Sequence, residues 1–240
     1  SYRFAAEAGI GALARAILAA DGQQIDAVLQ SPHFANQLFW YPVMDRRQLA
    51  AWVRAQYAAY FTTVAAFVAN EVTLAAVFAA WEEFQLLCTQ YEGIRGVEAM
   101  NALFDHGQDT WYTGRALIVT RNDYPLQVFN GDIGLVLPDS TVAGALRVFF
   151  PCDGGFRALH PARLPTHESA FALTVHKSQG SEFARVAVLL PEQAGSFADR
   201  RLLYTAVTRA KNHVTVLGSA SVIHEIVAQQ MPLSSGLAKR

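Results

Sequence analysis

The sequence predicts an α/β protein: a parallel sheet covered by helices on both faces, with a small antiparallel β-barrel inserted into it. Helical patterns alternate with short apolar runs, which are typical of strands buried between two helical layers. In residues 113–167 the pattern changes to short β runs separated by turn-forming residues, as in a small barrel. Hydrophobic residues make up 52% of the chain and charged residues only 16%, which allows a sizeable core. Average proteins carry roughly 25% charged residues.

The first helix is expected over residues 5–20, which are rich in alanine and carry apolar residues at helical spacing. The pair Asp21-Gly22 is expected to end this helix. Residues 23–44 contain two prolines, so we expect a loop with short elements there.

Two helices are expected next, over about 45–60 and 63–81. Aromatic residues recur along both of them. Buried helix faces use such residues routinely, so we expect these rings to pack in the core. The alternative is a helical surface that docks a neighbouring domain or subunit. The rings concerned are Trp52, Tyr57, Tyr60, Phe61, Phe67 and Phe78.

The apolar run 84–89 predicts a buried parallel strand, and a helical pattern resumes near 96–104. In the insert, strands are expected over 116–120, 133–137 and 146–150.

The α/β pattern then returns. Strands are expected over 171–175, 186–190 and 214–218, and a helix over 199–211. We therefore assign residues 1–112 and 168–240 to the α/β unit and residues 113–167 to the insert.

The overall charge gives no support for nucleic-acid binding, because the formal net charge is −1 and such proteins often have a strongly basic face. Cys88 and Cys152 form neither a CxxC pair nor a metal-ligand spacing, so we expect a reduced compartment, the cytoplasm, and no metal site. No apolar stretch predicts a membrane span. The sequence starts at Ser1 without methionine, and we interpret it as part of a longer chain.

The most informative stretch is 174–183, T-V-H-K-S-Q-G-S-E-F. A hydrophobic strand ends here in hydroxyl, imidazole, ammonium and amide groups. Ligands of open α/β sheets bind beyond the carboxyl ends of strands, and these groups are suitable donors to phosphate oxygens. Gly180 allows a positive φ or a close backbone approach, and Glu182 is an acceptor for sugar hydroxyls. The alternative is an ordinary polar turn before a helix.

The second stretch, 202–211, predicts an amphipathic helix that ends in Arg209 and Lys211. Two interpretations stay open from the residues alone. Basic residues at a helix C-terminus are expected from the helix dipole, and an arginine there could equally point at a ligand.

Both stretches resemble helicase motifs of superfamily 1. Residues 174–183 resemble motif V, and residues 204–210, Y-T-A-V-T-R-A, resemble motif VI. Residues 1–4, S-Y-R-F, are similar to the end of motif IV, and the three segments follow in the expected order.

The remaining strings narrow this resemblance to RecD-type helicases. They are Phe84–Cys88, Gly114-Arg115, Arg121-Asn122-Asp123, Phe129-Asn130-Gly131-Asp132-Ile133-Gly134, Arg163-Leu164-Pro165 and Ser235-Gly236-Leu237. The resemblance implies a RecA-like second motor domain and an SH3-like barrel insert that helps to channel a single DNA strand. In the insert, Asn122, Asp123, Asn130 and Asp132 are candidate site residues, but we interpret them as turn formers.

The resemblance implies an ATP-driven helicase that moves 5′ to 3′ on single-stranded DNA. Many members are the alpha chain of exodeoxyribonuclease V, which works with beta and gamma subunits at double-strand breaks. ATP and Mg²⁺ are bound between this domain and the protein's own N-terminal motor domain.

The resemblance also implies roles for single residues. Arg3 and Arg209 point at the γ-phosphate, and an arginine in this position is worth on the order of 10³–10⁵ in rate. The other implied contacts form two sets. Gln179, Gly180 and Glu182 line the nucleotide cleft, while Thr174, His176, Lys177 and Ser178 contact DNA or couple it to the cleft.

One motif of an ATPase is absent: no GxxxxGK[ST] phosphate-binding loop occurs in the 240 residues. We therefore expect this chain alone neither to hydrolyse ATP nor to unwind DNA. Two other hypotheses stay open, namely a non-enzymatic module that docks partner subunits and a related helicase that works alone.

Overall fold

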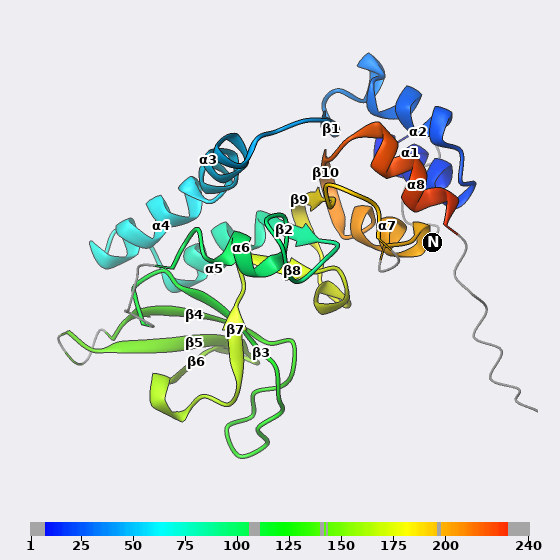
Figure 1. Cartoon of the computed structure of the whole chain (residues 1–240). Helices are drawn as coiled ribbons and strands as arrows, with labels where there is room; N and C mark the ends of the chain where they lie inside the picture. The colour runs from blue at the N-terminus through cyan, green and yellow to red at the C-terminus, as the bar shows by residue number, and fades with distance from the viewer. Residues whose placement is uncertain (1–7, 106–110, 140–141, 143, 196–197, 230–240) are drawn as a thin grey trace, which may run out of the picture.

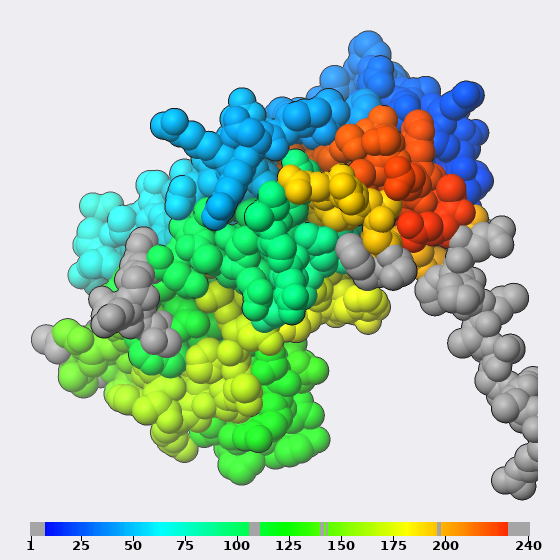
Figure 2. Space-filling model, in the orientation of Figure 1, coloured from blue at the N-terminus to red at the C-terminus, as the bar shows by residue number. Residues whose placement is uncertain are grey.

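The computed structural model describes residues 8–105, 111–139, 142, 144–195 and 198–229. Two five-stranded sheets organise these residues, one parallel and one antiparallel (Figure 1). The space-filling view shows the antiparallel part projecting from the rest of the molecule, at the bottom in green and yellow-green (Figure 2).

The parallel sheet has the strand order β1-β10-β9-β2-β8. Every neighbouring pair is parallel, so all five carboxyl ends lie at one edge of the sheet and all five amino ends at the other. The expected parallel sheet is thereby confirmed. Its strands are β1 (Leu38–Tyr41), β2 (Phe84–Cys88), β8 (Ala172–Thr174), β9 (Phe183–Leu189) and β10 (Ala210–Leu217).

Helices cover both faces of this sheet (Figure 1). One face carries α1 (Gly9–Leu18), α2 (Gly22–Leu29), α7 (Arg200–Val207) and α8 (Ala220–Ala228). The other side carries α3 (Arg46–Gln56), α4 (Ala58–Val68), α5 (Leu74–Glu82) and α6 (Val97–Asn101). None of the helices in the described residues is long and apolar enough to span a membrane.

The region 23–44, expected to be a loop with short elements, begins with the eight-residue helix α2. Ala20 has a positive φ of 56°, which turns the chain, and the Asp21 carboxylate then accepts a hydrogen bond from the amide of Gln24 at 2.9 Å. This side chain satisfies a free amide of the next helix, α2. Asp21 therefore follows the end of α1 and caps the start of a second helix, α2.

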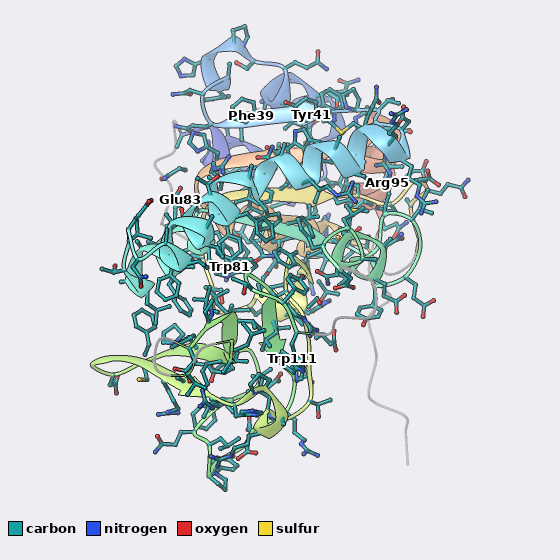
Figure 3. All side chains as sticks on the ribbon, turned by 90° about the vertical axis from the view of Figure 1, so that its left-hand side faces the viewer. Phe39, Tyr41, Trp81, Glu83, Arg95 and Trp111 are labelled. Carbon is teal, nitrogen blue, oxygen red and sulfur yellow. The ribbon has the colours of Figure 1, made fainter. Side chains whose placement is uncertain are left out.

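The aromatic rings along α3 to α5 pack in the core, as expected. Tyr57 and Tyr60 are almost completely buried. The Tyr57 hydroxyl donates to the carbonyl oxygen of Phe171, and that of Tyr60 donates to Gly114 at 3.0 Å. Burial raises the pKa of both phenols well above the usual value. Tyr57 also contacts the ring of Trp81, which lies between the helices and the antiparallel sheet (Figure 3).

The antiparallel sheet has the strand order β6-β5-β4-β3-β7. Three of its strands match the predicted runs, and two more were not predicted. The strands are β3 (Ala116–Val119), β4 (Ile133–Pro138), β5 (Leu146–Cys152), β6 (Gly155–Leu159) and β7 (His167–Ser169). A small separate core stabilises it, formed by Leu117, Val119, Leu126, Val128, Val136, Val148, Phe150 and Leu159.

The polar residues of the insert form turns, as interpreted from the sequence. Asp123 accepts from the amide of Leu126 at 3.0 Å, and Asp132 accepts from the amide of Phe129 at 2.8 Å. The side chain of Asn122 accepts from the amide of residue 130 at 2.8 Å. These side chains therefore stabilise the local backbone.

Candidate functional site

The segment that resembles motif V crosses the parallel sheet from one edge to the other. It leaves β8 at Thr174, forms the short 3₁₀ helix η3 (His176–Ser178), and enters β9 at Phe183. Because β8 and β9 are parallel, with β2 between them, the start and the end of this segment lie at opposite edges. Its residues therefore lie at two separate places, one at each edge of the sheet.

The carboxyl edge holds Thr174 and His176. Both line a hollow of about 430 Å³ with the segment that follows β2. His176 is exposed, and Thr174 is half-buried and accepts a hydrogen bond from the amide of Lys177 at 3.3 Å. The hollow is lined by Thr89, Gln90, Tyr91, Glu92, Thr174, Val175, His176 and Leu202.

Lys177 forms an ion pair with Glu168 of β7, with 2.6 Å between Nζ and Oε2. The Lys177 ammonium also lies 5.7 Å from the centre of the Tyr91 ring. The hydroxyl of Tyr91 donates to the same carboxylate oxygen at 3.4 Å. Partial burial raises the pKa of Tyr91, and the negative charge of Glu168 raises it further. Lys177 is therefore held by the antiparallel sheet.

Ser178 differs from the other residues expected to contact DNA. Its side chain is completely buried, and its hydroxyl donates to the carbonyl oxygen of Val175 at 2.7 Å. This hydrogen bond closes the 3₁₀ turn. In this conformation Ser178 stabilises the backbone and is not accessible to a DNA strand.

The amino edge holds Gln179, Gly180 and Glu182. Gly180 has a φ of 89°, a left-handed conformation that glycine adopts without steric cost. Gln179 and Gly180 are exposed, and Glu182 is half-buried just before β9. The turn at Gly180 therefore brings this part of the segment to the start of β9.

Arg209 lies at the same edge, between α7 and β10. Its Nη1 donates to the carbonyl oxygen of Ser181 at 3.3 Å, and its own carbonyl oxygen accepts from the amide of Phe183 at 3.0 Å. The structure thus joins the segments resembling motifs V and VI directly. Arg209 is half-buried, beside Gly180 and Glu182 in the fold.

A cleft of about 450 Å³ opens beside this edge, between α5, the antiparallel sheet and the Gly180 turn. Lys211 lines it together with Gly180 and Glu182. Lys211 is exposed, so it adds a positive charge next to the residues expected to bind nucleotide. The opposite wall includes Asp132 and Pro151 of the insert.

Three side chains that position the segment resembling motif V were not predicted from the sequence. Glu168 and Tyr91 hold Lys177, and Asn101 clamps the backbone that leads into β8. Asn101 donates to the carbonyl oxygens of Ser169 and Ala172, both at 3.0 Å, and accepts from the amide of Ala172 at 2.8 Å. No local pattern marks these residues, because their partners are distant in sequence.

Arg3 and the other residues of the segment resembling motif IV lie outside the described residues, as does the string 235–237. Within the described ranges, no group of three or more histidine, cysteine, aspartate or glutamate side chains could hold a metal ion.

Family comparison shows the class of protein to which this parallel sheet belongs. Residues 169–217 match the family model of the UvrD-like helicase C-terminal domain. This range runs from the end of β7 to the end of β10 and contains both motif-like segments. Residues 169–217 therefore belong to a helicase C-terminal domain.

Curated relatives specify the family. The chain is 36% identical over 243 residues to the RecBCD enzyme subunit RecD of Mycobacterium tuberculosis, covering 96% of this chain and 40% of that protein. It is 34% identical over 157 residues to the ATP-dependent RecD2 DNA helicase of Deinococcus radiodurans, covering 61% of this chain and 21% of that protein. The chain belongs to the RecD-type helicases of superfamily 1 and represents a C-terminal helicase region. It spans about 40% of the length of the RecD relative.

Among solved structures, a Bacteroides Pif1 helicase in complex with ADP-AlF3 and single-stranded DNA is similar, with 14% identity and a TM-score of 0.45. The match covers 88% of this chain and 69% of the Pif1 chain.

Proposed function

We propose that this chain forms the second motor domain of an ATP-dependent DNA helicase that moves 5′ to 3′ on single-stranded DNA. One observation carries the proposal. The segment resembling motif V places Thr174 and His176 at the carboxyl edge of the sheet and Gly180 and Glu182 at the amino edge. A motor requires a connection between its nucleotide site and its DNA site, because binding at each site must influence the other. One short segment provides this connection.

The amino edge is the nucleotide side in this proposal. Arg209 contacts the γ-phosphate and stabilises the charge that develops during phosphoryl transfer. Glu182 accepts hydrogen bonds from the ribose, and Gln179 and Gly180 line the cleft. Arg3 is proposed as a second phosphate ligand, by motif resemblance alone.

The fit to a nucleotide is partial, as expected for half of a site. The amino edge offers an arginine, an acidic side chain and an exposed glycine turn, while the cleft adds Lys211. Bound ATP supplies the phosphoanhydride whose hydrolysis drives the motor, and Mg²⁺ accompanies it. The phosphate-binding loop belongs to the N-terminal motor domain of the whole protein.

The carboxyl edge is the DNA side. Thr174 and His176 supply a hydroxyl and an imidazole to the strand, and Lys177 supplies a positive charge for a phosphate. Ser178 was expected in this set, but we propose only a structural role for it because its hydroxyl is buried and bonded to Val175.

We propose that residues 113–167 form an SH3-like barrel that guides the strand, and that residues 1–112 and 168–240 form the RecA-like domain. The pairing of β7 with β3 and the ion pair of Glu168 with Lys177 support a role for this insert beside the DNA side.

For the whole protein we propose the alpha subunit of exodeoxyribonuclease V, which acts with beta and gamma subunits in double-strand-break repair and recombination in the cytoplasm. The relative from M. tuberculosis is named as a subunit of the RecBCD enzyme, which supports this assignment over a helicase that works alone. Co-purification of the whole protein with its beta and gamma subunits tests it.

The 240-residue chain alone should be inactive, since it has no GxxxxGK[ST] loop. DNA-stimulated ATP hydrolysis by the purified chain would contradict this proposal.

The main test compares wild-type full-length protein with Arg209→Ala. We expect the DNA-stimulated ATPase rate to fall about a hundredfold or more, with nucleotide still bound. Arg201→Ala is a matched control, because Arg201 is exposed near the start of the same helix, close to the opposite edge of the sheet. An unchanged rate for Arg209→Ala would favour a module that only docks partner subunits.

A further inference from the structure

The ion pair between Lys177 and Glu168 has a consequence for DNA binding. The Lys177 ammonium is one of the groups proposed to contact a DNA phosphate, yet it lies 2.6 Å from the Glu168 carboxylate. Both side chains are partly exposed, at 30% and 37%. The pair is therefore reachable by a phosphate.

We propose that Glu168 is a positioning residue that competes with the DNA backbone for Lys177 and so weakens binding of the DNA strand at the carboxyl edge. The inference rests on the proposed function of the carboxyl edge. A carboxylate resembles a phosphate oxygen in charge and in its capacity to accept hydrogen bonds. A phosphate that approaches Lys177 therefore competes with Glu168 for the same ammonium group.

The surroundings of the pair favour exchange of Lys177 between two anions. Tyr91 is 41% exposed; its ring faces the Lys177 ammonium and its hydroxyl donates to Glu168. The ring can keep its contact with the cation while the carboxylate leaves. The negative charges of Glu92 and Glu98 raise the pKa of Tyr91, as that of Glu168 does. The surface around Lys177 is therefore acidic.

Glu168 also connects this competition to the insert. It lies in β7, whose backbone pairs with β3 of the antiparallel sheet, and the chain continues from β7 directly into β8. When a phosphate takes Lys177, strand β7, which pairs with β3 of the insert, loses a contact to the segment resembling motif V. Weak, reversible binding suits a motor, because the strand must be released in every cycle.

The test measures affinity of the 240-residue chain for a fluorescent oligothymidylate by anisotropy, between about 50 and 200 mM salt. For Glu168→Gln we expect about two- to fivefold tighter binding at low salt, the range that an exposed ion pair supports. The dependence on salt should become steeper, because no unpaired carboxylate is left to take up a cation. A residue that only stabilised the fold would not change this slope.

Glu92→Gln is the matched control. It removes the same charge from the same hollow, and within the described part of the chain Glu92 forms no ion pair with Lys177. The double variant Lys177→Gln with Glu168→Gln gives the second control. The gain from Glu168→Gln should shrink to that of Glu92→Gln when Lys177 is absent.

If the wild type binds the oligonucleotide and Glu168→Gln and Glu92→Gln increase its affinity equally, the proposed competition is wrong. The proposed DNA site at the carboxyl edge would then still stand. If neither the wild type nor any variant binds the oligonucleotide at low salt, the proposed DNA site at the carboxyl edge is wrong, and this inference is wrong with it.

Discussion

The guanidinium of Arg209 donates a hydrogen bond to the carbonyl oxygen of Ser181, with 3.3 Å between Nη1 and the oxygen. The two residues are 28 positions apart in sequence and belong to different helicase-like motifs. The amide of Phe183 donates to the carbonyl oxygen of Arg209, so the contact is made from both sides. Arg209 therefore joins the segment that ends α7 to the turn at Gly180.

Arg209→Lys should be nearly as harmful as Arg209→Ala in the full-length protein. A lysine keeps the charge but carries all its donors on one nitrogen, so it lacks the planar fork with which a guanidinium can hold Ser181 and reach a phosphate together. We expect kcat for DNA-stimulated ATP hydrolysis to fall at least about tenfold. A lysine variant with wild-type kcat would show that charge alone is sufficient at this position.

Sequence patterns predicted the buried strands well because their apolar runs are local. The run at 84–89 matches β2 closely, and the run at 186–190 covers the second half of β9, which begins at Phe183. Strand β1 was not predicted, since Leu38–Tyr41 is short and its only strand partner, β10, lies near the other end of the chain. Pairing over such a distance leaves no signal in a local window.

For the candidate site too, local features could be predicted from the sequence and tertiary contacts could not. The segments 174–183 and 204–210 were singled out by their resemblance to helicase motifs V and VI, because their chemistry alone left other interpretations open, and the polar turns of the insert were predicted from their composition. The division of the first set between two sheet edges follows from strand order, which a sequence pattern does not contain. The burial of Ser178 and the pairing of Lys177 with Glu168 likewise depend on tertiary contacts.

Asn101→Ala should destabilise the protein, because the amide of Asn101 bridges the backbone of Ser169 and Ala172 just before β8. Asn101 is only 8% exposed, so alanine leaves buried backbone groups without partners. We expect the free energy of unfolding in urea to fall by about 1–3 kcal/mol. Asn130→Ala is the control on an exposed turn, and a loss of equal size there would contradict the clamp.

Gly180→Ala should also cost stability, through backbone strain. The φ of Gly180 is 89°, and no atom lies within 4 Å of an added Cβ, so steric collision is excluded. The left-handed conformation costs about 1–2 kcal/mol for an alanine, whereas asparagine tolerates it better. Thermal unfolding should rank the glycine above asparagine and asparagine above alanine. Equal stability of all three would mean that the turn adapts to the side chain.

The two cysteines should differ strongly in their reaction with a thiol reagent. Cys152 is exposed at the end of β5, whereas Cys88 is completely buried in β2, between β8 and β9. Burial also raises the pKa of the Cys88 thiol, which lowers its thiolate fraction. In the native protein we expect one fast-reacting thiol with Ellman's reagent, and Cys152→Ser should remove that phase.

Labelling of Cys88 should require opening of the parallel sheet, and this makes it a probe of how the two sheets unfold. The antiparallel sheet has its own core and does not contain Cys88. If the insert opens first in increasing urea, the circular dichroism signal will begin to fall before Cys88 becomes reactive. Coincident transitions would show instead that both sheets unfold as one cooperative unit. Fast labelling of Cys88 without denaturant would contradict its placement between β8 and β9.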